Sequence, residues 1–205
     1  MPKRGYHHGN LAQALVEACL ALIKERGPTG FTLSEAAREA GVTPAAVYRH
    51  FQGREDLIAE AALQGYGIFA DKMESAYATG QPSDLRAFLN TGAAYLDFAR
   101  DHPGHYVAMF ESGISINRSA ELNAAASRAL GVLETAATDL SRHIPPDRRP
   151  PPQMFAAHIW ALSHGVVELF ARGSPGTKSP YPPADLLETG IGIYLRGLGL
   201  LPPDV

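Results

Sequence analysis

The sequence predicts an all-α protein, with a small N-terminal domain of three helices followed by a larger C-terminal helical bundle. Apolar residues recur at helical spacing along most of the 205 residues, and no convincing alternating strand pattern interrupts them. Hydrophobic residues make up 45% of the chain, which is enough to build a buried core. Residues 1–54 hold seven Lys and Arg against four Asp and Glu, whereas the rest of the chain is acidic overall. This division favours phosphate contact at one end only.

The first helix is expected to begin after Asn10, an N-cap residue with Gln13 in the capping-box position. Gly27 and Pro28 should end it, because glycine accommodates the left-handed residue after a helix and proline cannot continue one. Cys19 lies among apolar residues at helical spacing, so we expect a buried free thiol. A single cysteine cannot form an internal disulfide, which is typical of proteins of a reducing cytosol.

Two short helices are expected next. The first should run from Thr32 to Ala40, opened by a capping box of Thr32 and Glu35. Gly41 should break it at a tight turn that needs a positive φ. A second helix of about eight residues should then follow from Thr43 as its N-cap. This layout is that of a helix-turn-helix, in which the second helix enters a major groove of DNA.

The second of these helices carries side chains suited to DNA. Pro44 suits its first position, and the small Ala45 and Ala46 would let its N-terminal end approach the base edges closely. Further candidates for phosphate or base contact are Tyr48, Arg49 and His50 on the next turn, Arg54 at the start of the following helix, and Lys3 and Arg4 in an N-terminal basic arm. The alternative from these residues alone is an ordinary helical hairpin whose Arg and His side chains are merely solvated.

The rest of the chain should be a helical bundle. We expect a connecting helix at 55–78 and a proline-rich exposed loop at 144–152. Further helices are expected at 84–100, 105–112, 119–143, 153–172 and 184–199. The predicted domains are therefore 1–54 and 83–205.

The last two helices, near 153–172 and 184–199, are strongly apolar, and their large side chains recur at alternating spacings of four and three. Two such helices per subunit can pair across a two-fold axis as a four-helix bundle. They can equally be buried within a monomer, and the periodicity alone leaves both alternatives open.

The common catalytic and metal-binding motifs are absent from the sequence. The sequence lacks G-x-S-x-G, a phosphate loop, a dinucleotide fingerprint and a metal quartet, so we predict no enzyme and no cofactor. Ser112 beside a histidine could form a hydrolytic pair, but no pattern places them together. The histidines lack metal-ligand spacing, so no metal is predicted and local hydrogen bonding is expected for His158 and His164.

Targeting signals are also not evident. The N-terminus has no apolar signal segment, and no apolar run is long enough to span a bilayer. We therefore expect a soluble cytoplasmic protein.

The segment His8–Leu57 resembles the TetR family of bacterial transcription regulators. The recurring pieces appear in order as Glu25–Gly27 (E-x-G), Thr32–Ala37 (T-L-x-E-A-A), Ala40–Val42 (A-G-V), Val47–Phe51 (V-Y-R-H-F) and Arg54–Leu57 (R-E-D-L). The opening Tyr6–Leu11 (YHHGNL) is similar to a subgroup of that family. Trp160, His164, Gly165 and Leu169 resemble the W-x-x-x-H-G-x-x-x-L signature of one C-terminal subgroup.

The resemblance implies a ligand-responsive regulator, usually a repressor, that binds palindromic operator DNA as a homodimer through the last two helices. DNA-facing residues would be Thr43, Ala45, Ala46, Tyr48, Arg49, His50 and Arg54, with Ser34 near a phosphate. The C-terminal domain would bind a small apolar effector, with Phe88, Tyr95, Phe98, Tyr106, Met109, Phe110, Phe155 and Trp160 as lining candidates. The alternative is a small-molecule binding protein that retains the head only as scaffold.

Overall fold

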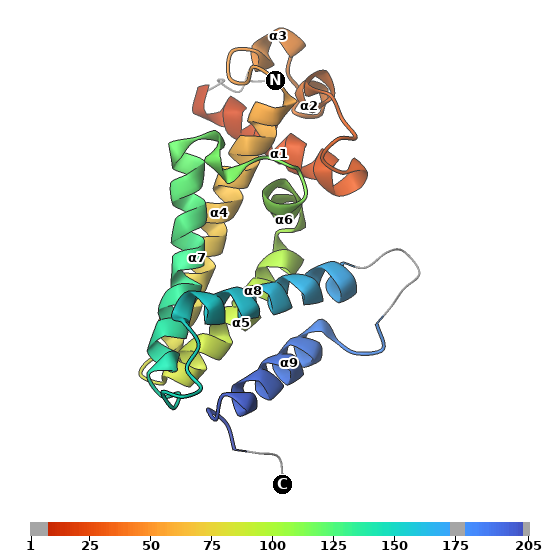
Figure 1. Cartoon of the computed structure of the whole chain (residues 1–205). Helices are drawn as coiled ribbons and strands as arrows, with labels where there is room; N and C mark the ends of the chain where they lie inside the picture. Colours follow the sequence, from red (N-terminus) through yellow and green to blue (C-terminus); the bar gives the residue numbers. More distant parts are fainter. Residues whose placement is uncertain (1–7, 173–178, 203–205) are drawn as a thin grey trace. The chain divides into compact units, whose positions relative to one another are not determined.

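The computed structural model describes residues 8–172 and 179–202, so Lys3 and Arg4 lie outside the described residues. Within those ranges the regular structure is entirely helical, which confirms the predicted all-α class (Figure 1). The elements are α1 (His8–Arg26), α2 (Leu33–Glu39), α3 (Pro44–Val47), α4 (Arg54–Gly80), α5 (Asp84–Asp101), α6 (Pro103–Phe110), η1 (Ile116–Arg118), α7 (Ala120–Ser141), α8 (Pro152–Val166), η2 (Val167–Ala171) and α9 (Pro183–Gly197).

Most predicted helices form within a few residues of their expected bounds, but the start of α1 was predicted wrongly. Asn10 lies inside the helix, which begins at His8. Gln13 does not close a capping box, because its side-chain amide donates to Glu17 Oε1 at 3.5 Å. The predicted end is confirmed by Gly27, whose φ of 75° is the left-handed conformation that follows many helices.

The chain divides into two compact units. Unit 1 contains the residues up to Ile68 together with His102–Ala126, and unit 2 contains Phe69–Asp101 together with the residues from Ser127 onward. Each of α4 and α7 therefore contributes residues to both units. The predicted domains, 1–54 and 83–205, were defined by expected function rather than by compactness. Their boundaries stay a prediction.

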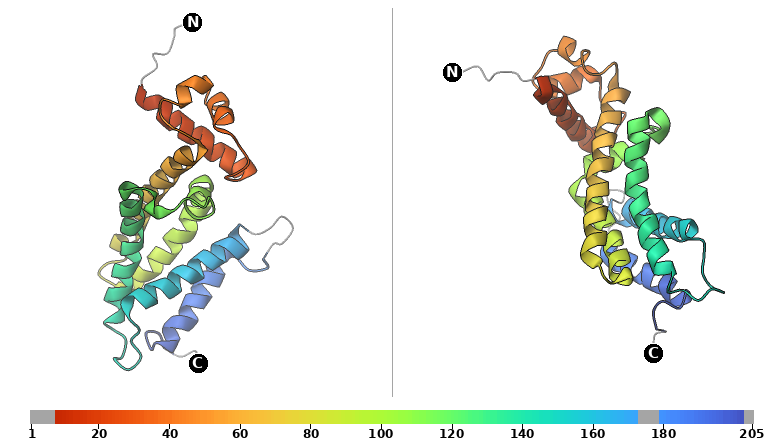
Figure 2. Two further views of the ribbon diagram at one scale, coloured as in Figure 1. Left: turned by 45° about the horizontal axis from the view of Figure 1, so that its top comes forward. Right: turned by 90° about the vertical axis from the view of Figure 1, so that its left-hand side faces the viewer.

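Unit 1 is built on α1, which packs against α2 and α6 (Figure 2). The inward face of α1 is fully buried at Leu15, Val16 and Cys19. Burial raises the pKa of the Cys19 thiol to about 12, so the thiol is an inert packing group, as predicted. Gly104 lets α6 approach α1, because a Cβ at this position would lie 3.0 Å from the backbone oxygen of Leu20.

Unit 2 holds a continuous aromatic and aliphatic core between α5, α8 and α9. Phe155 of α8 is fully buried, and its ring lies 5.0 Å from that of Phe88 and 5.6 Å from that of Tyr194. Gly190 brings α9 close to α8, since a Cβ there would lie 3.1 Å from Leu162 Cδ2. These contacts resolve which face of the last two helices is internal.

Most of the periodic stripe on α8 and α9 faces the interior of unit 2. The members Phe155, Ile159 and Val166 of α8, and Leu187 and Ile191 of α9, are at most 5% exposed. The sequence pattern therefore identifies packing within the unit rather than a surface for a second copy. Large apolar side chains are exposed at Met154 of α8, at Leu169 and Phe170 of η2, and at Ile193 of α9, and of these Leu169 belongs to the predicted stripe.

The segment Pro152–Ala171 corrects one further expectation. By length and composition these residues form a helix that is apolar enough to cross a membrane, contrary to the prediction that no such run exists. About a third of the segment is buried within the protein, where α8 packs on α5 and α9. A helix that contributes to the core of unit 2 can therefore have the length and apolar composition of a membrane-spanning helix.

Candidate nucleic-acid interface and ligand domain

The helix α2 is fixed by a reciprocal capping box, as the sequence predicts. The backbone N–H of Thr32 donates to Glu35 Oε2 at 2.8 Å, and the backbone N–H of Glu35 donates to Thr32 Oγ1 at 3.2 Å. The Thr32 backbone N–H and the Thr32 hydroxyl both donate to the Glu35 carboxylate, and these bonds hold the pKa of Glu35 below the usual range. The start of the helix-turn-helix is therefore set by local hydrogen bonds.

The turn between α2 and α3 has the predicted geometry. Gly41 has a φ of 71°, which side chains with a Cβ rarely adopt. The backbone N–H of Val42 then donates to the carbonyl of Ala37 at 2.9 Å. Ala36 and Ala37 are fully buried, as is Val47 of α3, so the two helices meet through small side chains.

The helix α3 is shorter than the eight residues predicted. It spans Pro44–Val47, and the chain continues as turns in which the N–H groups of His50 and Phe51 both donate to the carbonyl of Val47. Thr43 is the N-cap by position, although its side chain makes no capping hydrogen bond. Burial of Phe51, which is 8% exposed, draws the chain inward after this segment and ends the helix early.

The residues predicted to face DNA are mostly exposed in this segment. Tyr48 is 60% exposed, and Thr43, Ala45, Arg49 and His50 are also exposed. Ala46 and Ser34 are intermediate. Together these residues form a surface on unit 1, here called the recognition surface: Thr43, Ala45, Ala46, Tyr48, Arg49 and His50.

Arg54 has a structural role that the sequence did not indicate. Its Nη1 donates to the carbonyls of Thr29 and Phe31, at 3.1 and 3.2 Å. The guanidinium therefore ties the start of α4 to the loop between α1 and α2. Phosphate contact by Arg54 remains a prediction, and the same holds for Lys3 and Arg4, outside the described residues.

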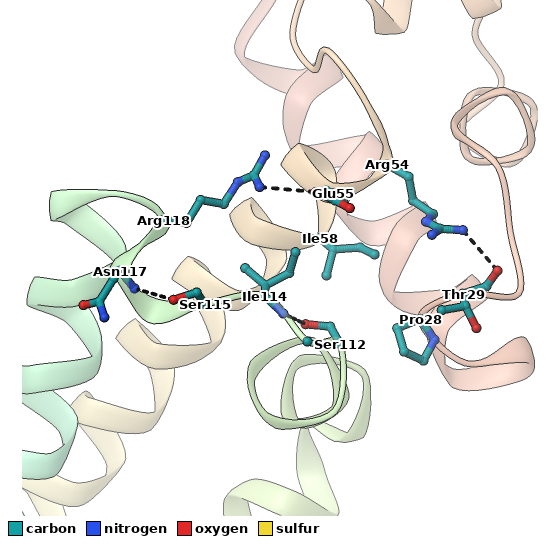
Figure 3. Close-up of a pocket in the computed structure, with 11 residues that line it drawn as sticks. Pro28, Thr29, Arg54, Glu55, Ile58, Ser112, Ile114, Ser115, Asn117 and Arg118 are labelled. Atoms are coloured by element: carbon teal, nitrogen blue, oxygen red, sulfur yellow. Dashed lines mark hydrogen bonds and ion pairs between the residues drawn. The ribbon is translucent and has the colours of Figure 1, made fainter.

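A polar pocket of about 410 Å³ lies in unit 1 between the first turns of α4, the α1–α2 loop and the segment that joins α6 to α7 (Figure 3). It is lined by Pro28, Thr29, Arg54, Glu55, Ile58, Ser112, Gly113, Ile114, Ser115, Asn117 and Arg118. None of the predicted effector-lining residues is among them. The sequence did not single out Arg118 or its neighbours, because the pocket is lined by residues such as Glu55 and Arg118 that lie about sixty positions apart in the chain.

The predicted effector-lining residues are divided between the two units. Phe88, Tyr95, Phe98, Phe155 and Trp160 belong to unit 2, whereas Tyr106, Met109 and Phe110 belong to unit 1. In unit 1 the rings of Tyr106 and Phe110 lie 4.9 Å apart. All eight residues except Phe110 and Trp160 are buried, so most serve as core packing in this structure.

A polar cluster lies within the aromatic core of unit 2. The Tyr95 hydroxyl and His164 Nδ1 are 2.8 Å apart, and Trp160 Nε1 donates to the same hydroxyl at 3.4 Å. Phe69 packs edge-on against Tyr95 with ring centres 5.2 Å apart. Local hydrogen bonding was predicted for His164 and is confirmed, as it is for His158, whose Nδ1 lies 2.8 Å from the Tyr194 hydroxyl.

Comparison with known families settles the classification. A family described as "Tetracyclin repressor-like, C-terminal domain" matches residues 88–194, which is more than half of the chain. A second, described as "Bacterial regulatory proteins, tetR family", matches residues 15–61. The chain belongs to the TetR family. The N-terminal part of this TetR-family protein thus matches bacterial regulatory proteins, and its larger part matches the C-terminal domain of tetracyclin repressor-like proteins.

Individual relatives agree with this assignment. The uncharacterised HTH-type transcriptional regulator YobS of Bacillus subtilis is 30% identical over 100 residues, which are 49% of this chain and 51% of YobS. The match thus spans about half the length of this curated relative. A structure of a protein of unknown function from Rhodococcus sp. RHA1 superposes with a TM-score of 0.79 at 24% identity, covering 96% of this chain and 99% of that one. AibR, solved in complex with isovaleryl coenzyme A and operator DNA, has a TM-score of 0.70 at 18% identity, covering 89% and 96%.

Proposed function

We propose that this TetR-family regulator is a cytoplasmic repressor that binds palindromic operators as a homodimer and is released by a small apolar effector. The observation that carries the proposal is the recognition surface, which follows a capped α2 and a glycine turn and leaves Tyr48, Arg49 and His50 exposed. These side chains offer a hydroxyl, a guanidinium and an imidazole to phosphates and base edges.

Affinity for DNA should come mainly from phosphate contacts. The positions best placed to approach base edges, Thr43 and Ala45, carry short side chains, and Ala45 offers only a methyl group. Arg49 is exposed and forms no ion pair within the described residues. An exposed guanidinium is suited to a phosphate, whereas the alanine methyl suits the methyl group of thymine.

The test is binding of the purified full chain to labelled DNA fragments from upstream of its own gene and its neighbours, at several salt concentrations. We expect one fragment to bind in preference to a shuffled duplex of the same length, with affinity falling as salt rises. Protection of two half-sites one helical turn apart is expected for a dimer. Small-molecule binding without any DNA binding would instead support the alternative of a binding protein that retains the head as scaffold.

A homodimer through α8 and α9 is supported by their exposed side chains. Met154, Leu169, Phe170 and Ile193 are 42–67% exposed although each is large and apolar. Exposed large apolar side chains are common at protein interfaces, and two α8–α9 pairs can form a four-helix bundle. The occupant that we propose is a second copy of the chain, related by a two-fold axis.

Sedimentation of an Ile193→Glu variant tests the dimer. A buried charge at the centre of an interface should weaken self-association by at least about 100-fold, so the variant should sediment as a monomer. Thr135→Glu is the control, because Thr135 is exposed on α7 of the same unit. A wild-type protein that is monomeric at all concentrations would overturn the dimer.

The effector is proposed to bind in unit 2, at the cluster of Tyr95, Trp160 and His164. Its surroundings are aromatic, and the hydroxyl, indole and imidazole groups supply a few polar contacts in an apolar setting, as ligand sites commonly do. AibR, with isovaleryl coenzyme A and operator DNA, is a precedent for one protein of this fold holding both kinds of partner. Loss of operator binding on adding an apolar ligand, prevented by Tyr95→Phe, is the expected result.

A further inference from the structure

The helix α4 begins with two carboxylates directly after the recognition surface. Glu55 and Asp56 lie in its first turn, and Asp56 Oδ2 accepts a hydrogen bond from the backbone N–H of Gln52 at 3.0 Å. Acidic residues at this place stabilise the start of a helix. The same negative charges repel DNA phosphates when they lie close to a DNA-binding surface.

Arg118 of η1 pairs with both of these carboxylates. Its Nη1 donates to Glu55 Oε2 at 3.3 Å (Figure 3), and its Nη2 donates to Asp56 Oδ1. The segment that carries Arg118 is itself held in place. Ser115 Oγ accepts the backbone N–H of Asn117 at 3.2 Å, and the Asn117 side chain accepts from that of Asn123 at 2.8 Å.

The local charge balance depends on this arginine. In the first turn of α4, Arg54 contributes one positive charge and the two acids contribute two negative charges, so the turn is net negative by itself. The Arg54 guanidinium is directed to the carbonyls of Thr29 and Phe31 rather than to the two carboxylates. Arg118 supplies the charge that brings the group to neutrality.

We propose that Arg118 is a positioning residue for DNA binding, which neutralises Glu55 and Asp56 so that the recognition surface is not opposed by their charge. The proposal rests on the DNA-binding surface proposed above. The pairs are partly exposed, since the side chains of Arg118 and Glu55 are 37% and 68% exposed. Exposed ion pairs contribute little to folding stability, so an effect on DNA binding can be separated from one on the fold.

The test measures binding of the full chain to a short duplex of arbitrary sequence at low ionic strength, by fluorescence anisotropy. Arg118→Ala should weaken binding about threefold to tenfold, and Arg118→Glu should weaken it further, because each leaves more negative charge beside the phosphates. The deficit should shrink as salt is added. Thermal melting of each variant confirms that the fold is retained.

Two comparisons distinguish charge neutralisation from a structural role. In a Glu55→Gln/Asp56→Asn background, which keeps an amide oxygen to accept the Gln52 N–H, Arg118→Ala should have no further effect. Arg128→Ala is the matched control, because Arg128 also pairs with two carboxylates, Asp71 and Glu74, but belongs to unit 2. It should bind DNA as the wild type does.

Three results would overturn the proposal: unchanged binding by Arg118→Ala, a deficit that persists without the two carboxylates, or an equal deficit in Arg128→Ala. If the wild type itself binds no DNA, the proposed recognition surface is wrong. If the wild type binds and Arg118→Ala binds equally well, only the role of Arg118 is wrong.

Discussion

The helices α3 and α8 differ in what their apolar side chains contact. Of the four residues of α3, only Val47 is buried, whereas α8 buries five of its fifteen residues: Phe155, Ala156, Ile159, Ser163 and Val166. The exposed positions of α3 are available to a molecule outside the chain, and the buried positions of α8 hold unit 2 together. A substitution in α8 should therefore be detected in stability, and one near α3 should be detected in DNA binding.

The largest expected effect is on the interior of unit 2. Phe155→Ala removes a fully buried ring that lies against Phe88 and Tyr194, and should lower the free energy of unfolding by about 3–5 kcal/mol. Urea denaturation measures this change. The control is Gln153→Ala on the same helix, where an exposed polar side chain should cost under about 1 kcal/mol. Equal losses in the two variants would contradict the assignment of the buried face.

The half-buried side chain of His105 in unit 1 extends the comparison to pH. Burial, with a smaller contribution from His102, lowers the pKa of His105 from 6.5 to about 4. Above about pH 6.5 the imidazole is neutral in both states, so stability has its full value. As the pH falls towards 4, the unfolded chain takes up a proton that the folded chain excludes, and stability is lost.

We expect His105 to account for a loss of about 1–2 kcal/mol in the free energy of unfolding between neutral pH and pH 4, after allowance for partial exposure. Denaturation of the wild type and of His105→Gln is measured across this pH range. The difference between the two pH profiles gives the contribution of His105 to the free energy of unfolding. Parallel profiles would show that His105 titrates alike in the folded and unfolded states.

On the exposed side, Arg49→Ala should leave stability unchanged and lower DNA affinity about tenfold, while reducing the salt dependence by about one phosphate contact. Anisotropy titrations at several salt concentrations give both quantities. Arg148→Ala, a similarly exposed arginine of unit 2, is the control and should bind normally. A weaker affinity with the same salt dependence would argue against a phosphate contact.

The smallest expected effect concerns the support of the recognition surface. Thr32→Ala removes the capping box of α2 and should destabilise the fold by about 1 kcal/mol, measured by thermal or urea denaturation. Thr32→Ser keeps the hydroxyl and should restore most of the loss. If both variants were equally destabilised, the methyl group of Thr32 rather than its hydrogen bonds would be responsible.

The helix-turn-helix segment was more predictable than the C-terminal helices, because the sequence signals that define it come from neighbouring residues. The capping box joins Thr32 to Glu35, and the turn depends on Gly41 alone, so a few neighbouring residues define both. The length of α3 was predicted wrongly, because its end is set by the burial of Phe51 rather than by a breaking residue. Local signals thus place the turn better than they place the end of the helix.

Contacts between distant residues could not be predicted. Arg118 meets Glu55 across more than sixty positions, and neither residue belongs to a pattern that names the other. Periodicity correctly identified one face of α8, but the same spacing fits a core within the unit and a seam between two subunits. Only the packing of Phe155 against Phe88 shows which partner that face has.

The short side chains at Thr43 and Ala45 have a consequence for how such a regulator diverges. Both positions are exposed, so a longer side chain there projects into solvent in the free protein and leaves the packing of α2 on α3 intact. Surface substitutions of this kind usually change stability by less than about 0.5 kcal/mol. A duplicated copy of the gene can therefore acquire a new operator through single changes that folding does not oppose.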